Sequence, residues 1–281
     1  MEQAVEIVRF TDADIPFGKM LTDAENWHRT NEDWRRMLAI SPSGMFKARL
    51  GGKDVGIAGL LAYEKVAWMH SVIVVDKMRG RGIGRVLMRT CIDHAKDQGI
   101  LSVKLDSVRG FEGFYGKFGF VEEFESRRFL RNGAHFHRMA ERVDRKRLDE
   151  LLEMDEAANG YDRSRVLTAI YDDAPELAFC ISGPKGIRGF VLARRGDQRT
   201  QIGPCIVPHK DPIVATHLIS TLIGSNPEAK YRLCISGTNE GAVKLALDLG
   251  FESVMSSTRM YLGQKFHESD ASFAMISPEK G

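Results

Sequence analysis

The chain has 281 residues, a length that favours two domains over one. Hydrophobic residues make up 43% of it, which is enough for packed cores. Its formal net charge of +2 gives no reason to expect nucleic-acid binding. The N-terminal residues lack the basic start and apolar run of a signal peptide, no uncharged stretch reaches membrane-spanning length, and the four cysteines show no C-x-x-C spacing. These features predict a cytoplasmic protein with buried, reduced thiols and without a membrane or nucleic-acid partner.

The first half of the chain carries alternating strand and helix signals. Residues 11–14 and 30–33 have the side chains of helix caps, the second set as a capping box with Asp33 in the acidic position. Residues 51–54, G-G-K-D, give a hairpin signal between two apolar runs. The predicted elements are, in order, a strand at 5–10, a helix from Pro16, a helix after residue 30, and strands at 45–50, 55–63 and 66–75.

The last of these strands leads into a loop in which arginine and glycine alternate, V-I-V-V-D-K-M-R-G-R-G-I-G over residues 72–84. Glycines permit the tight turns that make successive N–H groups converge on an anion. A helix is predicted from Ile83 by the apolar spacing that follows, so the loop ends at a helix N-terminus, which also favours negative charge. The pattern predicts a phosphate-binding loop made of Arg79, Gly80, Arg81, Gly82, Ile83, Gly84 and Arg85.

Two common phosphate loops do not fit this stretch. A Walker loop ends in Gly-Lys-Ser/Thr, whereas this loop ends Gly84-Arg85-Val86. The dinucleotide fingerprint G-x-G-x-x-G is not matched by G-R-G-I-G, and no ribose-binding carboxylate follows at the required place. A plain surface turn with solvated arginines is the remaining alternative for the loop alone.

The run R-x-x-G-x-G from Arg79 to Gly84 resembles the acyl-CoA pyrophosphate loop of the GNAT family of N-acyltransferases. After a predicted strand at 103–106, the sequence F-Y-G-K-F-G-F at 114–120 is similar to the family's second signature, Y-x-x-x-G-F. Two signatures in the right order are a stronger indication than either one alone. The resemblance implies an α/β (α+β) fold in which a mixed, mainly antiparallel sheet is flanked by helices.

The second half repeats the plan of the first at a period of roughly 130 residues. Residues 179–190 mirror the earlier hairpin, and L-G-F at 249–251 mirrors F-G-F at 118–120. With G-Y-D-R-S-R-V-L after residue 159, I-G-P at 202–204 and R-M-Y-L-G from residue 259, this half resembles the C-terminal domain of bacterial tandem acetyltransferases. We therefore expect two tandem GNAT-like domains: a catalytic, acetyl-CoA-binding domain at 1–138 and a degenerate domain at 139–281.

The second copy lacks the phosphate loop. Sliding one copy over the other sets Val207 on Val75, and the loop then falls on K-D-P-I-V-A-T at 210–216, which has no glycine. Asp211 brings a carboxylate to the diphosphate position, and Pro212 has no N–H to donate. The second domain is predicted not to bind coenzyme A in the usual way.

The resemblance also implies how acetyl-CoA is held. In the family's arrangement the pantetheine arm pairs like an added strand with the backbone of Ile73, Val74 and Val75, and the diphosphate docks on the loop. The family's tyrosine lies beside the thioester sulfur, which makes Tyr115 the candidate acid for the departing thiolate.

For the base, His70 is the first candidate, because histidine titrates in the useful range and lies near the position where many relatives carry a glutamate or a water-holding group. Its alternative is a half-buried strand histidine with a satisfied hydrogen bond. Glu64 and Asp106 are further candidates. Asp155, Asp162 and Arg163 are the residues by which the second half could contribute to a site.

The acceptor site is expected between the first two helices and the hairpin, with Trp27, His28 and Tyr63 as the substrate-binding residues. Further aromatic residues that could line it are Trp34, Trp68 and Phe111. Tryptophans in amphipathic segments are more often part of the core. The sequence thus predicts a monomeric or homodimeric, metal-free N-acetyltransferase that moves an acetyl group from acetyl-CoA to a small-molecule primary amine. A protein or peptide N-acetyltransferase and a non-catalytic acyl-CoA sensor are the alternatives.

Overall fold

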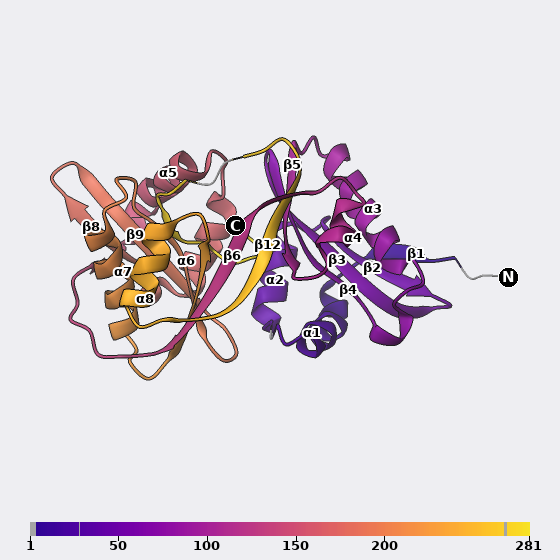
Figure 1. Cartoon of the computed structure of the whole chain (residues 1–281), viewed down its shortest axis with the longest axis horizontal. Helices are drawn as coiled ribbons and strands as arrows, with labels where there is room; N and C mark the ends of the chain where they lie inside the picture. Colours follow the sequence, from indigo (N-terminus) through magenta and orange to yellow (C-terminus); the bar gives the residue numbers. More distant parts are fainter. Residues whose placement is uncertain (1–3, 28, 267–268) are drawn as a thin grey trace. The chain divides into compact units, whose positions relative to one another are not determined.

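The computed structural model describes residues 4–27, 29–266 and 269–281. The chain forms two compact units, Met1–Leu105 and Asp106–Gly281 (Figure 1). Within the described residues no helix is long and apolar enough to cross a membrane. All four cysteines are free and buried, as predicted, and burial raises the pKa of the Cys91 thiol to about 12.

The first unit is built on a mixed sheet. Its first four strands run antiparallel to their neighbours in chain order, and the fifth is parallel to the fourth. The predicted strands of this half are confirmed to within two residues at each end, and the G-G-K-D hairpin joins the second strand to the third. The strands are β1 (Glu6–Arg9), β2 (Met45–Leu50), β3 (Lys53–Tyr63), β4 (Val66–Val74) and β5 (Ser102–Val108).

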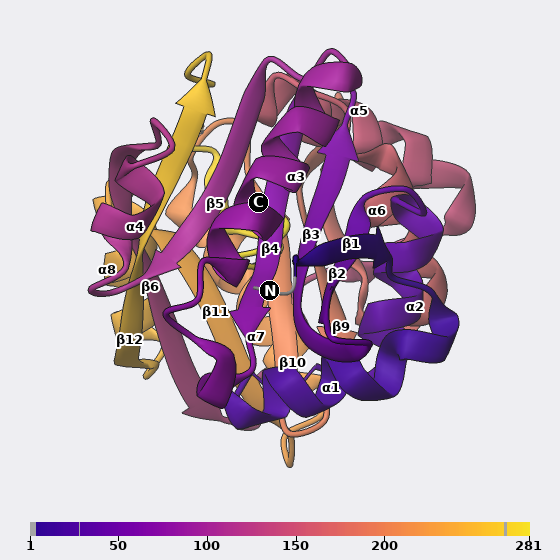
Figure 2. The ribbon, with the colours of Figure 1, turned by 90° about the vertical axis from the view of Figure 1, so that its right-hand side faces the viewer.

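Three helices cover this sheet: α1 (Ile15–Ala24), α2 (Asn31–Ile40) and α3 (Ile83–Asp97). The predicted capping box at α2 is confirmed, because the Thr30 side chain accepts a hydrogen bond from the Asp33 N–H at 2.9 Å. Trp34 is fully buried in a cluster with Phe10, Ile57 and Ile73. Helix α3 lies across β3 and β4, which positions its N-terminus at the end of β4 (Figure 2).

The second unit holds a seven-stranded path in the order β12-β6-β11-β10-β9-β8-β7, with β13 beside β10. Its strands are β6 (Val121–Asn132), β7 (Glu141–Arg142), β8 (Phe179–Gly183), β9 (Gly186–Arg195), β10 (Thr200–Ile206), β11 (Lys230–Ser236), β12 (Glu252–Gly263) and β13 (Ser272–Ala274). Its helices are α4 (Glu112–Gly116), α5 (Leu148–Asn159), α6 (Ser164–Asp173), α7 (Pro212–Gly224) and α8 (Glu240–Asp248).

The register of the strands supports the predicted repeat. In β4 the pairing with β3 slips by one residue between His70 and Ile73, and in β10 the pairing with β9 slips between Ile202 and Cys205. The same spacing of 132 residues separates His70 from Ile202 and Ile73 from Cys205. Strand β10 is therefore the counterpart of β4, and Val207 corresponds to Val75 as the sequence predicted.

Strand β6 shows why the compact units and the repeat divide the chain at different points. By sequence β6 closes the first copy, yet it lies between β11 and β12 of the second (Figure 1). Ser126 pairs with Ser257, which is its counterpart when Gly250 is set on Gly119 at a spacing of 131 residues, so the last strands of the two copies pair around a local two-fold axis. The compact division therefore precedes β6, whereas the copy boundary at 138/139 remains a prediction about the repeat.

Candidate active site

The arginine–glycine loop makes a sharp entry into α3. Gly80 and Gly82 both have φ of 79°, in the left-handed region, and Gly82 is the N-cap of the helix. The first hydrogen bonds into the helix are donated by the N–H groups of Arg85 and Val86 to the Gly82 carbonyl, at 3.0 and 3.1 Å. The preceding N–H groups, those of Ile83 and Gly84, are therefore available to an external acceptor. The loop thus leaves two backbone donors at the N-terminus of α3, and their use for a phosphate stays a prediction.

The three arginines of the loop differ in their ion pairs and hydrogen bonds. Arg79 braces the loop, because it pairs with Glu25, lies 3.4 Å from Asp76 and donates through Nε to the Val74 carbonyl at 3.1 Å. Arg81 and Arg85 are exposed, and neither has an ion pair within the described part of the chain. Arg81 and Arg85 are consequently the exposed positive charges of the loop, while Arg79 holds the loop against β4.

Strand β4 extends beyond the residues that pair with β5. The parallel ladder runs from Val66↔Ser102 to Trp68↔Lys104, and β4 continues to Val74. A bulge interrupts β4 at Ser71, which has a φ of 54°. The stretch from Ile73 to Val75 thus follows the bulge and leads directly into the loop.

His70 is buried at the bulge, with 5% of its surface exposed. Its Nδ1 lies 2.9 Å from the Ser71 hydroxyl and 3.5 Å from an Arg29 guanidinium nitrogen. Gly59 makes room for the ring, since a Cβ there would lie 2.1 Å from His70 Cε1. The structure therefore brings His70 into a buried polar cluster of the first unit.

The expected acceptor-binding residues have separate environments. Trp27 is half-buried and packs against the apolar cluster that contains Ile73, with Val75 packed against the same cluster. Tyr63 is buried at the end of β3, with 4% exposed surface, and is not a member of that cluster. His28 lies outside the described residues. Trp34 and Trp68 are fully buried core residues.

The second signature is a turn built around Tyr115. Gly119 has a φ of 90°, and the Phe120 N–H donates to the Tyr115 carbonyl at 3.4 Å, so the chain folds back onto the helical turn. The Tyr115 ring contacts Phe114 and Phe120 edge-on, with ring centroids 5.2 and 6.1 Å apart. Burial raises the pKa of the Tyr115 phenol to about 12, which keeps it protonated at neutral pH.

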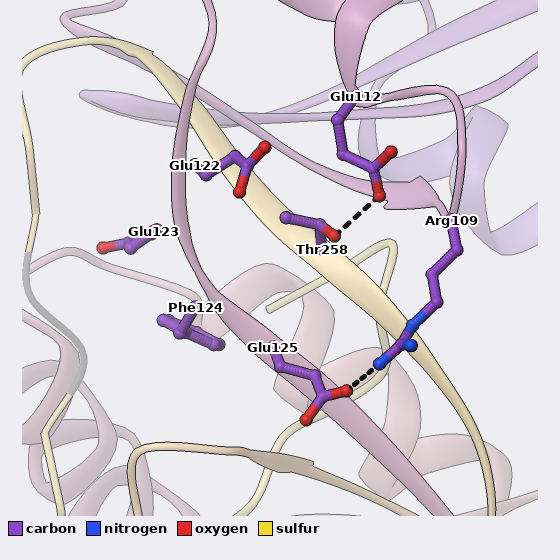
Figure 3. A pocket seen from close by; sticks show the side chains of 7 residues that line it. All are labelled: Arg109, Glu112, Glu122, Glu123, Phe124, Glu125 and Thr258. Atoms are coloured by element: carbon purple, nitrogen blue, oxygen red, sulfur yellow. Dashed lines mark hydrogen bonds and ion pairs between the residues drawn. The ribbon is translucent and has the colours of Figure 1, made fainter.

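A pocket of 480 Å³ in the second unit lies beside the N-terminus of α4 (Figure 3). Glu112 accepts hydrogen bonds from the Thr258 hydroxyl and the Gly110 N–H, both at 2.8 Å, and Glu125 is paired with Arg109. A hydrogen bond from its own backbone N–H, followed by the one from Thr258, lowers the pKa of the Glu112 carboxyl, so it is ionised at neutral pH. The pocket is lined by Arg109, Glu112, Glu122, Glu123, Phe124, Glu125 and Thr258.

The sequence interpretation above names none of these lining residues. The signal it missed is the run E-E-F-E at 122–125, which puts carboxylates on both faces of one strand. Much of the hydrogen-bonding capacity of Glu112 and Glu125 is used within the protein. The pocket is therefore a polar surface feature beside the tyrosine turn to which we assign no ligand.

The second copy closes the same helix terminus with its own side chain. Asp211 caps α7 by accepting from the N–H groups of Ile213 and Val214, at 2.9 and 3.5 Å, and it pairs with Arg188 at 2.8 Å. The predicted carboxylate at the diphosphate position is thus present, and it uses the donors that a phosphate would need. The counterpart of Tyr115 is Ala246, which lies as far before Gly250 as Tyr115 lies before Gly119.

The remaining candidates in the second half form structural contacts. Arg163 and Asp155 make a buried two-bond ion pair at 2.6 and 2.8 Å, which joins α5 to the start of α6. Asp162 accepts from the Ser164 N–H at 2.6 Å in a turn before α6. These residues therefore hold two helices together.

Comparison with known families agrees with this description. Two family models, each described as "Acetyltransferase (GNAT) domain", match residues 10–143 and 151–273. Together they account for nearly the whole chain, which therefore belongs to the GNAT family of acetyltransferases and consists of two tandem GNAT domains. The chain is an acyltransferase of this type, and proteins with such domains generally take the acyl group from acyl-CoA.

Several relatives share much of the chain. It is 24% identical over 249 residues to holothin acyltransferase of Pseudoalteromonas sp., covering 86% of this chain and 82% of that protein. A putative acetyltransferase from Pyrococcus horikoshii has a TM-score of 0.83 at 25% identity, covering 100% of this chain and 97% of that one. A tandem GNAT protein from the clavulanic acid biosynthesis pathway shares the fold at 14% identity, with a TM-score of 0.64, 94% of this chain covered and 100% of that one.

Proposed function

We propose that this protein is an N-acetyltransferase that moves an acetyl group from acetyl-CoA to a primary amine of a small molecule, with the catalytic site formed by the first copy. The observation that carries the proposal is the open N-terminus of α3, where Gly80 and Gly82 expose the backbone and the N–H groups of Ile83 and Gly84 are available. The second copy has no equivalent, since Asp211 already caps α7.

The cofactor would lie along β4 and end on the loop. The diphosphate would accept from the loop N–H groups and attract Arg81 and Arg85, and the pantetheine arm would pair with the backbone from Ile73 to Val75. This assignment is supported by the end of the β4–β5 ladder at Trp68, well before Ile73. Both contacts are largely with backbone, so they select an acyl-CoA and leave the acyl chain and the acceptor open.

The transfer forms one bond and breaks one. The amine nitrogen attacks the thioester carbonyl carbon, the C–N bond forms, the C–S bond breaks, and the thiolate of coenzyme A takes up a proton. A thiol has a pKa of about 8.5, so a proton donor gives moderate assistance at the lower end of about 10²–10⁴-fold. We assign this donation to Tyr115, whose raised pKa of about 12 keeps the phenol protonated.

The amine must lose a proton before or during attack. For an amine with a pKa of about 10.4, deprotonation at pH 7 costs about 4–5 kcal/mol, so a base lowers the barrier. We assign this role to His70, acting through the Ser71 hydroxyl or water because the imidazole is buried. Trp27, His28 and Tyr63 are our candidates for the acceptor side.

Two observations favour a small acceptor. The protein named holothin acyltransferase matches over most of both chains, and a further relative, glucosamine 6-phosphate N-acetyltransferase 1 of Oryza sativa, is 36% identical over 59 residues, 21% of this chain and 36% of that protein. Both names specify a small-molecule acceptor for those proteins. We extend that class of acceptor, a small amine, to this chain.

The test is thiol release from acetyl-CoA in the presence of amino acids, polyamines, amino sugars and N-terminal peptides, corrected for acceptor-free hydrolysis. Release that depends on a small amine is the expected result. Release with peptides alone would identify a peptide N-acetyltransferase instead. Acetyl-CoA binding without release across the panel would contradict turnover of these amines and favour the sensor.

A further inference from the structure

The segment 271–276 fills a gap between two strands of the second unit. Strands β10 and β11 pair in parallel from Thr200↔Tyr231 to Ile202↔Leu233, and their ladder then ends. We call the space beyond these pairs the β10–β11 gap. Strand β13 enters this gap and runs antiparallel to β10, with Ala274 opposite Cys205 and Ser272 opposite Ile206.

Main-chain hydrogen bonds tie the segment to both sides of the gap. The Val207 N–H donates to the Ala271 carbonyl at 2.8 Å, on the β10 side. The Met275 N–H donates to the Cys234 carbonyl at 2.8 Å, on the β11 side. The segment thus satisfies backbone groups that two diverging strands would otherwise leave unpaired inside the unit.

The site of this pairing is the counterpart of the strand that we assign to the cofactor in the first copy. The spacing of 132 residues that relates the two bulges sets Cys205 on Ile73, and it sets Val207 on Val75. The first copy has an acyl-CoA strand to fill this position, on the assignment above. The second copy fills it with its own chain.

Side chains around the gap are fitted to the segment. Asn239, the N-cap of α8, donates through its amide to the carbonyls of Asp270 and Ser272, both at 3.0 Å, while its oxygen accepts from the Ala242 N–H. Gly203 faces the segment so closely that a Cβ there would lie 1.9 Å from the Met275 carbonyl oxygen. The polar contacts and the missing side chain indicate a built-in position for this segment.

We propose that residues 271–276 are an intramolecular substitute for the pantetheine arm, which occupies the β10–β11 gap permanently and excludes a second acyl-CoA. The comparison with pantetheine rests on the proposed function of the first copy, whereas the occupation of the gap does not. The absent diphosphate loop and the occupied gap then act together: the second copy lacks the donors for one end of the cofactor, and its own chain covers the place of the other.

The first experiment uses the full chain and reads the segment directly. Gly203→Ala introduces the conflict with Met275 at a backbone φ of 137°, and Gly160→Ala, with a φ of 77° and no heavy atom within 4 Å of its added Cβ, is the control for backbone strain. Cys205 is buried in the same cluster as Phe273 and Ala274, so its alkylation reports opening of the gap. We expect alkylation of Cys205 to be about tenfold faster in Gly203→Ala than in Gly160→Ala, with faster amide exchange in residues 271–276.

Equal alkylation rates in a folded Gly203→Ala protein would overturn the proposal, because the segment would then not depend on the fit at the gap. If Gly203→Ala does not fold, Asn239→Asp replaces it in the full chain, because it keeps the oxygen that caps α8 and removes the amide donor to the carbonyls of Asp270 and Ser272. We expect faster alkylation of Cys205 than in the unaltered chain. An unchanged alkylation rate would contradict the proposed fit. None of these readouts uses acetyl-CoA, so they stand apart from a failure of the proposed function.

Discussion

Tyr115 shows how one residue can be assigned a role from its surroundings. Its phenol lies in a turn fixed by Gly119 and packs against Phe120, and the same burial that positions the ring raises its pKa to about 12. A phenol with this pKa stays protonated and can donate a hydrogen bond to the departing sulfur, which stabilises the developing thiolate, whereas full transfer of its proton to a thiolate of pKa about 8.5 runs uphill. It is a poor base at neutral pH, which is why we assign the other proton transfer to His70.

We expect Tyr115→Phe to lower kcat for acetyl transfer by about tenfold to a hundredfold, because the thiolate loses its donor while the ring packing is kept. The KM for acetyl-CoA should change little, since the diphosphate and pantetheine contacts remain. Steady-state thiol release measures both values. Tyr261→Phe, a half-buried tyrosine on β12, is the control. An unchanged kcat in Tyr115→Phe would remove the tyrosine from the mechanism.

Gly82 is the residue on which the anion site most depends. Its φ of 79° costs a residue with a Cβ about 1–2 kcal/mol, so Gly82→Ala should shift the loop and weaken acetyl-CoA binding by about fivefold to thirtyfold. Gly99→Ala is a matched control, because Gly99 has a φ of 71° and equally open surroundings at the other end of α3. Isothermal titration of both variants separates lost affinity from general strain. Equal affinities in the two variants would contradict the loop assignment.

At the scale of elements, α3 and α7 are the clearest pair. Both follow a bulged strand and present a helix N-terminus, but Gly82 leaves one open and Asp211 closes the other. A carboxylate on the terminal N–H groups supplies the same negative charge that a phosphate would bring. On the proposed function, the difference between a copy that binds the cofactor and one that does not lies in the N-cap residue.

The joint between α5 and α6 is held by the buried pair of Asp155 and Arg163. We expect Arg163→Met to lower the free energy of unfolding by about 3–5 kcal/mol, because it leaves the Asp155 carboxylate buried without this partner. Chemical denaturation measures the change. The double variant with Asp155→Leu should recover much of the loss, since it removes the isolated charge. If the double variant is as unstable as the single one, packing and not charge accounts for the effect.

At the scale of the whole molecule, we infer that the two copies have different tasks. The second keeps the fold of the first, has lost the glycine loop and the tyrosine, and holds residues 271–276 in the β10–β11 gap. The sheet of the second copy also depends on the first copy, because strand β6 of the first copy pairs with β11 and β12. The second unit is therefore not closed without residues that the repeat assigns to the first copy.

This division predicts the binding stoichiometry. We expect isothermal titration of the full chain with acetyl-CoA to give one site per chain. Gly82→Ala should weaken that one site and reveal no other. A second site of comparable affinity would contradict the assignment of the two copies, whichever amine the enzyme uses.

The sequence by itself determined the features that depend on local chemistry. Glycine spacing, N-cap residues and strand patterns report backbone conformation over a few residues, so the loop, the capping box at Thr30, the start of α3 and the carboxylate of Asp211 were all predicted from the residues. The repeat was predicted as well, since the two copies share local patterns in the same order.

Only the tertiary structure decided the pairings between distant segments. Main-chain hydrogen bonds place β6 between β11 and β12, and they place β13 in the β10–β11 gap. Every residue except proline can donate such a bond, so no side-chain pattern identifies the partner strand. The burial of His70 beside Arg29 and the glutamates around the pocket likewise depend on which elements meet. Local backbone conformation depends on a few neighbouring residues, so it can be predicted from the sequence. Pairing between distant segments depends on the free energy of the whole folded chain.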